Sequence, residues 1–327
     1  MSGRPVGARQ SEPDSIAQPA IGGVAVADLS TVLGAVVWLS LTATGALDTI
    51  ERALALAPLV LVPLALRTAV TRTFQAPANR LTTTAIWLQP AGALLLAASL
   101  VVSSPAPLAA ALATPWLAVT GLLGYTALVR THRRGGLSLP ETAIDAGFAY
   151  ISVGAVALLL AHLDLTFWFD RVIIRLTAVH FHYAGFVLPV AAGLAGRHLG
   201  AHLRGFRAVV GVILVGPALI AVGIAFSPVV EIIAVSVFTV AVAAFGVLVL
   251  WRVVPSCSRP QGVLLGVSAV ALPVSMALAL GYGVSTFTGR SLGLTISTMV
   301  ALHGSLNAFG FGLCAMLGWR LGHSWAA

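Results

Sequence analysis

The fold of this chain is decided by residues 172–196, VIIRLTAVHFHYAGFVLPVAAGLAG. The stretch exceeds the roughly 20 apolar residues that a helix needs to cross a hydrocarbon core of about 30 Å. It also carries Arg175, His180, His182 and Tyr183 well inside its length. Polar groups at that depth are costly, and by default they mark a functional site with partners on neighbouring helices. The sequence therefore predicts a membrane protein with a buried polar site.

The composition of the whole chain agrees with a membrane protein. Of 327 residues, 58% are hydrophobic and only 9% are charged, and the mean hydropathy is +0.99. A soluble domain carries about 25% charged residues, so lipid must be the solvent here. The net charge of +8 comes from 18 arginines without a single lysine. The arginines lie between apolar runs rather than on one face, so we expect no nucleic-acid partner. This residue usage is typical of a GC-rich genome such as that of an actinobacterium.

Ten apolar runs have the length of a membrane-spanning helix. They cover residues 29–47, 53–72, 81–103, 107–130, 142–163, 171–196, 206–226, 229–251, 261–285 and 292–319. The predicted fold class is therefore an all-α, polytopic transmembrane bundle of about ten helices, located in the cell membrane. With both termini in the cytoplasm, 14 of the 18 arginines fall on the cytoplasmic side. This distribution satisfies the positive-inside rule.

The remaining segments leave room for one domain. Residues 1–27 are polar and rich in Gly, Pro and Ser, and we expect a disordered tail. Residues 28–327 then form a single transmembrane helical domain. The loops contain neither a P-loop nor a dinucleotide-binding glycine motif. The two cysteines lack metal-ligand spacing. We therefore predict no metal and no cofactor.

Two predicted helices place imidazoles at a similar depth. His180 lies about 14 Å below the start of its helix at 1.5 Å per residue, and His303 lies at a comparable depth in the last helix. His180 and His182 are about 200° apart around the helix, so they cannot share a face. His303 and Asn307 share one face. The set predicts an interior pocket; alternatively, these groups only hydrogen-bond the helices to one another.

Glu231 is a further candidate, at the start of the eighth predicted helix. A desolvated carboxylate there could donate a proton, whereas the structural alternative is a favourable charge at a helix N-terminus. We assign His180, His182, His303 and Glu231 as candidate catalytic residues. The candidate substrate-binding residues are Arg175, Phe181, Tyr183, Asn307 and Phe309.

Three resemblances bear on function. Residues 180–183, His-Phe-His-Tyr, resemble the tetrapeptide with which heme-copper oxidases bind two hemes on one helix. The further histidines of a copper site are missing, although one heme between two facing helices would need only two ligands. Residues 176–186 and 303–311 resemble the two signature stretches of the YndJ-like family, which implies no defined activity. In architecture alone, the chain is similar to the polytopic terpene cyclases of microbial secondary metabolism.

These observations favour an integral-membrane isoprenoid cyclase. A lipophilic prenylated or epoxidised substrate would reach the site through the membrane lipids. Acid-initiated cyclisation needs an acid, a base and a dry pocket. Aromatic faces would stabilise the carbocations that develop. The alternatives from other classes are a proton-coupled transporter and a heme-binding membrane protein.

Overall fold

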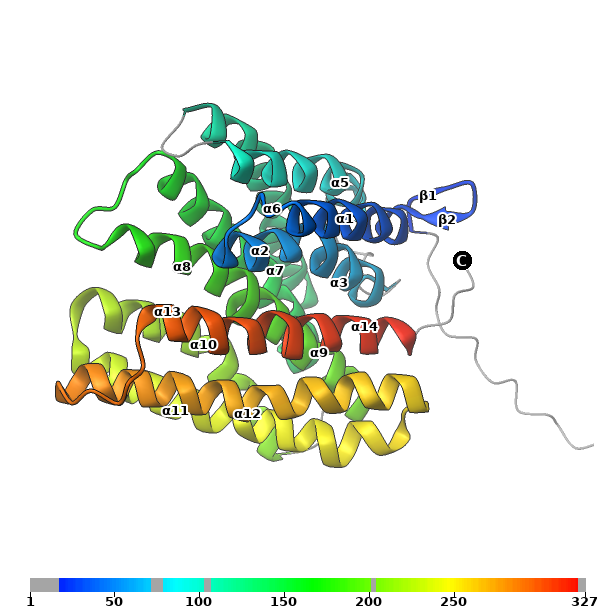
Figure 1. Cartoon of the computed structure of the whole chain (residues 1–327). Coiled ribbons are helices and arrows are strands. Elements are labelled where there is room, and N and C mark those ends of the chain that lie inside the picture. The colour runs from blue at the N-terminus through cyan, green and yellow to red at the C-terminus, as the bar shows by residue number, and fades with distance from the viewer. Residues whose placement is uncertain (1–17, 72–78, 103–106, 201–203, 323–327) are drawn as a thin grey trace, which may run out of the picture.

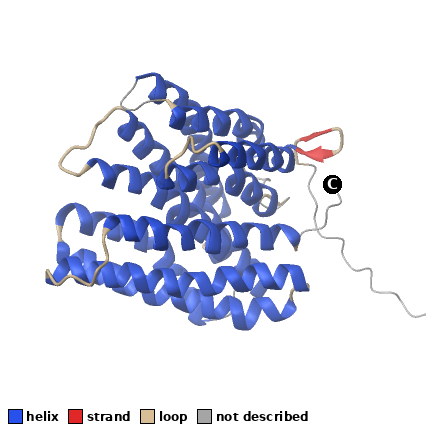
Figure 2. Cartoon of the chain, in the orientation of Figure 1, coloured by secondary structure: helices blue, strands red, loops and turns tan. Residues whose placement is uncertain are grey.

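The computed structural model describes residues 18–71, 79–102, 107–200 and 204–322. This part of the chain is almost entirely helical (Figure 2). The first 17 residues of the predicted tail lie outside the described residues. Residues 18–27 of that tail are folded: β1 (Ala20–Ile21) pairs with β2 (Val24–Ala25), and a helix begins at Val26.

Ten helical spans in the described residues are long and apolar enough to cross a membrane, which confirms the predicted all-α polytopic bundle. The first five spans are α1 (Val26–Ala43), α2–η1–α3 (Thr49–Leu56, Ala57–Leu61, Val62–Ala69), α5 (Asn79–Val101), α6 (Pro107–Arg134) and α7 (Leu139–His162). The other five are α8–η2–α9 (Arg171–His182, Tyr183–Val187, Leu188–Leu199), α10 (Arg204–Phe226), α11–η3–η4 (Pro228–Leu248, Val249–Val253, Val254–Ser256), α12 (Arg259–Thr288) and α13–η5–η6–α14 (Ile296–Met299, Val300–Gly304, Leu306–Leu313, Cys314–Leu321).

The first span differs from the prediction, since it runs from Val26 to Ala43 rather than over residues 29–47. Gly45 has a φ of 70°, which a helix cannot continue through. Asp48 then caps α2: its carboxylate accepts from the Glu51 amide at 2.8 Å, and the Glu51 carboxylate accepts from the Asp48 amide at 2.8 Å. This capping box fixes the start of the second span.

The spans form two groups with the last span between them (Figure 1). The first group contains α1 to α9, in which α6 packs against both α5 and α7. The second group contains α10, α11 and α12, packed in chain order. The last span contacts α12 on one side and α3, η2 and α9 on the other. The β1–β2 hairpin and the end of α14 lie at the same end of the bundle (Figure 1), as an even number of spans requires.

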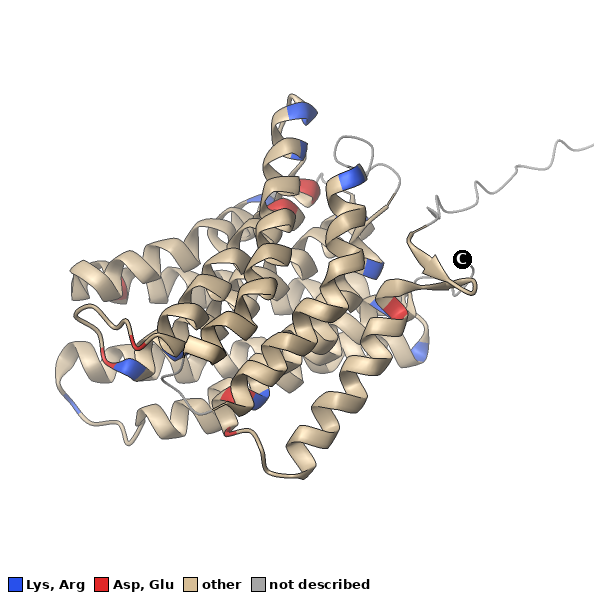
Figure 3. Ribbon diagram, turned by 90° about the horizontal axis from the view of Figure 1, so that it is seen from above, with Lys and Arg blue, Asp and Glu red and all other residues tan. Residues whose placement is uncertain are grey.

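Charged residues lie near the ends of the helices, and the middle of the bundle carries few of them (Figure 3). We call the end where α3, α6, α9 and α14 finish the arginine-rich end. The other end, where α2 and α8 begin, carries Asp48, Glu51 and Asp164 and is called the acidic end.

Five segments of the described spans are π-helical: η1, η2, η3, η5 and η6. A proline follows each of the first three and cannot donate an N–H to the carbonyl four residues earlier. These prolines are Pro63 after η1, Pro189 after η2 and Pro255 after η3. The last span contains no proline, although η5 and η6 make it the longest π-helical run. Its irregularity therefore has another cause, and single-turn π-helices frequently mark functional sites.

Candidate functional site

His182 faces the interior of the bundle. Its side chain is completely buried, and Trp116 on α6 donates from Nε1 to the His182 Nε2 at 3.0 Å. The His182 Nδ1 lies 2.7 Å from the Ala178 carbonyl oxygen. A carbonyl only accepts, so Nδ1 carries the hydrogen and the imidazole is neutral. Both ring nitrogens are thus occupied: Nε2 joins α8 to α6, and Nδ1 bonds within α8.

His180 lies on the opposite side of α8, as the spacing predicts, and its side chain is exposed. Its Nδ1 lies 2.7 Å from the Leu176 carbonyl oxygen, so this nitrogen also carries a hydrogen. Its Nε2 makes no hydrogen bond with any described residue. The ring faces His303 of η5, with the ring centroids 6.2 Å apart and the planes inclined by 26°. The structure thus brings together the two imidazoles that the sequence places at equal depth.

His303 belongs to a hydrogen-bonded cluster with Ser275 of α12 and Asn307 of η6. Its Nδ1 lies 2.9 Å from both the hydroxyl and the carbonyl oxygen of Ser275. Its Nε2 lies 3.2 Å from the Asn307 side-chain nitrogen. That nitrogen also donates to the Ser275 hydroxyl at 2.6 Å and to the His303 carbonyl at 3.0 Å. The Asn307 amide is therefore committed to the protein itself.

Arg175 lies closer to the acidic end than the histidines. Its guanidinium donates to Asp48 at 2.5 Å and approaches Glu51 at 3.4 Å. These carboxylates are the capping box of α2, and α2 also packs against η5. The arrangement joins the second, sixth and tenth spans at the edge of the histidine pair. Its role in substrate binding stays a prediction.

The three candidate aromatic residues each pack against another span. Phe181 lies 5.7 Å from the Tyr150 ring on α7, and Phe309 lies 5.9 Å from the Trp38 ring on α1. Tyr183 is buried, and its hydroxyl donates to the Ala53 carbonyl at 2.7 Å. These contacts fix the rings in place, and their contact with a substrate stays a prediction.

Glu231 lies in the first turn of α11, where Ser227 caps the helix. Its half-buried carboxylate makes no hydrogen bond or ion pair with a described residue, and so none with the histidines. Gly223 of α10 packs directly against its backbone. The structure thus leaves this candidate acid unpaired and does not bond it to the other candidates.

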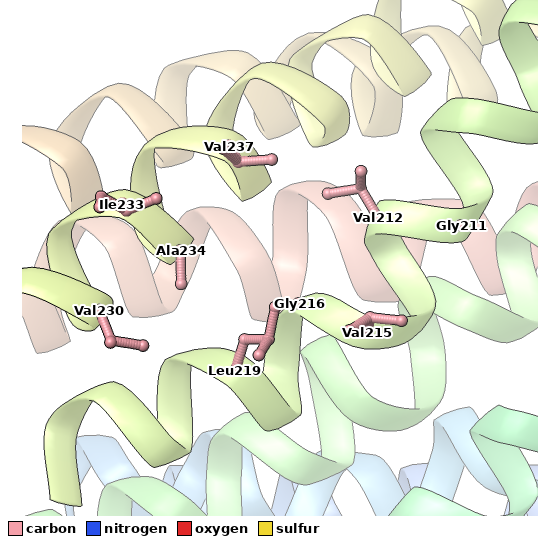
Figure 4. Close-up of a pocket in the computed structure, with 9 residues that line it drawn as sticks. All are labelled: Gly211, Val212, Val215, Gly216, Leu219, Val230, Ile233, Ala234 and Val237. Carbon is pink, nitrogen blue, oxygen red and sulfur yellow. The ribbon is translucent and has the colours of Figure 1, made fainter. Parts of the chain in front are cut away.

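Two apolar grooves lie on the second group of spans. One, of about 400 Å³, runs between α10 and α11 and has only apolar side chains and glycine in its lining (Figure 4). The other, of about 770 Å³, lies between α12 and the last span, and its lining includes Val274, Leu302 and Leu306. Each of these residues directly precedes one of the three members of the Ser275–His303–Asn307 cluster. The larger groove is therefore adjacent to the cluster.

Sequence reasoning did not identify Ser275 or Trp116, which bind the ring nitrogens of His303 and His182. A serine and a tryptophan in apolar helices carry no distinctive signal, because only the packing shows what they face.

The sequence reasoning also missed the charged cluster at the arginine-rich end. There Arg130 pairs with both Glu141 and Asp145, Arg197 pairs with Glu141, and Arg134 pairs with Asp145. No group of three or more potential metal-binding side chains occurs within the residues that the structure describes.

Comparisons with known proteins agree with the resemblance noted in the sequence. The family model described as YndJ-like protein matches residues 52–311, which include both signature stretches. A protein of Bacillus subtilis (strain 168), described as "Uncharacterized membrane protein YndJ", is 33% identical over 208 residues. The match covers 63% of this chain but only 37% of that relative. No solved structure matches the chain.

Proposed function

The chain belongs to the YndJ-like family, and from that premise we propose that it is an integral-membrane isoprenoid cyclase. The reaction is an acid-initiated isomerisation of a prenylated or epoxidised prenyl substrate. One observation carries the proposal. Among the ring nitrogens of His180, His182 and His303, only Nε2 of His180 is without a hydrogen-bond partner in the described residues. It belongs to an exposed side chain in a membrane-spanning helix, where an unused polar group is costly.

The protonated His180 would start the reaction. Its Nε2–H gives a proton to the epoxide oxygen, or to a terminal alkene carbon, while Nδ1–H stays bonded to the Leu176 carbonyl. The epoxide C–O bond breaks, or the π bond of the protonated alkene is lost to give a carbocation. Double bonds of the chain attack this electron-deficient carbon, so that carbon–carbon bonds form. The final carbocation loses a proton, which the now neutral Nε2 accepts. The histidine returns to its starting state, and the product keeps the mass of the substrate.

The larger groove suits the apolar part of such a substrate. It is a shallow, open apolar surface of about 770 Å³, so an apolar tail would lie along it and remain in contact with lipid. It is lined by Pro273, Val274, Ala277, Leu278, Leu294, Leu302 and Leu306. An isoprenoid tail could occupy it directly from the bilayer, with its reactive end toward the histidine pair.

The test is product formation in membranes that contain the wild-type protein or His180→Ala. Prenylated and epoxidised prenyl substrates are supplied, and cyclised products of unchanged mass are measured. General acid–base catalysis contributes about 10²–10⁴-fold, so we expect at least a hundredfold loss in the variant. His132→Ala is the matched control, because this exposed histidine at the arginine-rich end has no contact with the pair. Equal rates for wild type and His180→Ala would contradict the proposal, as would wild-type protein that cyclises none of the substrates.

A second candidate function is a proton-coupled carrier. The observation that favours it is the difference between the two ends of the bundle. The cluster around Arg130 and Asp145 closes the arginine-rich end, and both side chains are less than 5% exposed. The exposed His180 lies toward the acidic end instead. Proton uptake by protein in liposomes, driven by a gradient of a lipophilic solute, would favour the carrier. An absorbance spectrum of the same preparation tests for bound heme.

A further inference from the structure

We propose that Ser275 and Asn307 are positioning residues for His303 in the cyclisation. They hold its ring neutral and in a fixed orientation opposite the free Nε2 of His180. The inference rests on the proposed function and assigns a different role to each imidazole: His180 carries the proton, and His303 stays neutral.

The contacts of Ser275 define the hydrogen position on His303. Ser275 is completely buried, and its carbonyl oxygen lies 2.9 Å from the His303 Nδ1. A carbonyl oxygen only accepts hydrogen bonds, so Nδ1 must carry the hydrogen. The Asn307 side-chain nitrogen, a donor, lies 3.2 Å from Nε2. An Nε2–H would face this donor, so Nε2 carries no hydrogen and the ring has no charge. The two amide hydrogens are shared among Nε2, the Ser275 hydroxyl and the His303 carbonyl.

Asn307 also explains the irregular backbone of the last span. Its side-chain nitrogen donates to the His303 carbonyl at 3.0 Å, so this carbonyl of the helical ladder has a side-chain donor. Side chains that insert into the ladder are a known cause of local distortion. This supplies a cause for the π-helical run of η5 and η6, which no proline explains. The distortion and the orientation of His303 thus have a common origin in one amide.

The hydrogen bonds of Ser275 and Asn307 to His303, called the clamp below, determine which imidazole takes the proton. Two imidazolium rings with centroids 6.2 Å apart would repel each other in a low-dielectric site. A neutral His303 leaves His180 free to be protonated. The nearby ionisable groups are already engaged, since Glu51 of α2 approaches Arg175 and Arg52 donates to the Leu47 carbonyl. His180 is thus the ionisable group in ring contact with His303.

The clamp is tested by two readouts on the full chain. In ¹⁵N spectra of histidine-labelled protein, we expect His303 to be neutral with its hydrogen on Nδ1. Asn307→Leu removes the donor that faces Nε2 and should convert that signal to a mixture of hydrogen positions. Ser275→Ala keeps the carbonyl that accepts from Nδ1, so the hydrogen should stay on Nδ1 while the ring signal broadens. The same variants should lower kcat at least tenfold and change KM less than twofold. Ser275→Thr keeps the hydroxyl and should restore both readouts.

Ser268→Ala is the matched control, because Ser268 is buried on the same helix without a contact to His303. Unchanged spectra and unchanged kcat in Ser275→Ala and Asn307→Leu would overturn the clamp. If Asn307→Leu does not fold, Asn307→Ala takes its place, because it removes the same donor to Nε2. The spectra need no substrate, so the clamp is tested even if the wild-type protein cyclises nothing. Cyclisation by variants whose spectra match wild type would instead refute the clamp and leave the proposed function intact.

Discussion

A methyl group added at Gly154 should destabilise the protein because the space it needs is occupied by His182. A Cβ at this position would lie 2.6 Å from Nδ1 and 2.9 Å from Cε1 of the His182 ring. It would also lie 3.0 Å from the Ala178 carbonyl oxygen. The ring cannot swing away without losing its bonds to Trp116 and Ala178, and the carbonyl belongs to the backbone of α8.

The expected loss of stability follows from a comparison of alanine substitutions at two glycines, Gly154 and Gly121. Overfilling a well-packed site costs about 1–3 kcal/mol, whereas replacing glycine by alanine within a helix gains up to about 1 kcal/mol. Gly121→Ala is the matched control, because a Cβ at position 121 of α6 meets no atom within 4 Å. The gain in helix propensity is similar in both variants and cancels. We therefore expect Gly154→Ala to be less stable than Gly121→Ala by about 1–3 kcal/mol.

The assay is reversible unfolding in mixed micelles with increasing sodium dodecyl sulfate, followed by tryptophan fluorescence. Wild type and both variants are compared at the same lipid-to-detergent ratio. Equal stability of Gly154→Ala and Gly121→Ala would refute the reasoning. It would mean that His182 does not lie against α7 as described.

Three further predictions concern other contacts. Tyr183→Phe removes the hydrogen bond to the Ala53 carbonyl and should lower the free energy of unfolding by about 0.5–1.5 kcal/mol, the net contribution of one hydrogen bond; the micelle assay measures this. Asp28→Asn removes the carboxylate that pairs with the buried Arg320 and should destabilise by about 3 kcal/mol or more, seen as lower yield of folded protein after detergent extraction. Glu231→Gln should leave the free energy of unfolding within about 0.5 kcal/mol of wild type and product formation within about twofold, because the carboxylate has no hydrogen bond or ion pair with a described residue to lose; a hundredfold fall in product formation would make Glu231 the acid instead of His180.

The number and position of the spans could be predicted because hydropathy and length suffice to define a membrane helix. The end of the first helix could not be, because apolar residues continue past Ala43 to Leu47. There the turn at Gly45 and the cap at Asp48 decide the boundary. Such local signals are weaker than the run of apolar residues in which they lie.

The candidate site was predictable in part. Helical periodicity alone separates the faces of His180 and His182, and equal depth places His180 near His303. The partners were not predictable, because they come from spans far away in the sequence. Trp116 is 66 residues from His182, and Ser275 is 28 residues from His303. Periodicity gives the direction of a side chain, but only the packing of the spans gives its neighbour.

The two ends of the bundle are held by ion pairs of different strength. At the arginine-rich end, Arg130 pairs with Asp145 where both side chains are less than 5% exposed, and breaking a buried pair costs about 3–5 kcal/mol. At the acidic end, Arg171 pairs with Asp164 where both are at least 40% exposed, and such pairs contribute only about 0–1 kcal/mol. On the proposed function, we predict that a lipid-borne substrate gains access at the acidic end, where the ion pairs, including that of Arg175 with Asp48, are more exposed. The exposed side chain of His180, which faces His303 of the last span, also lies toward the acidic end.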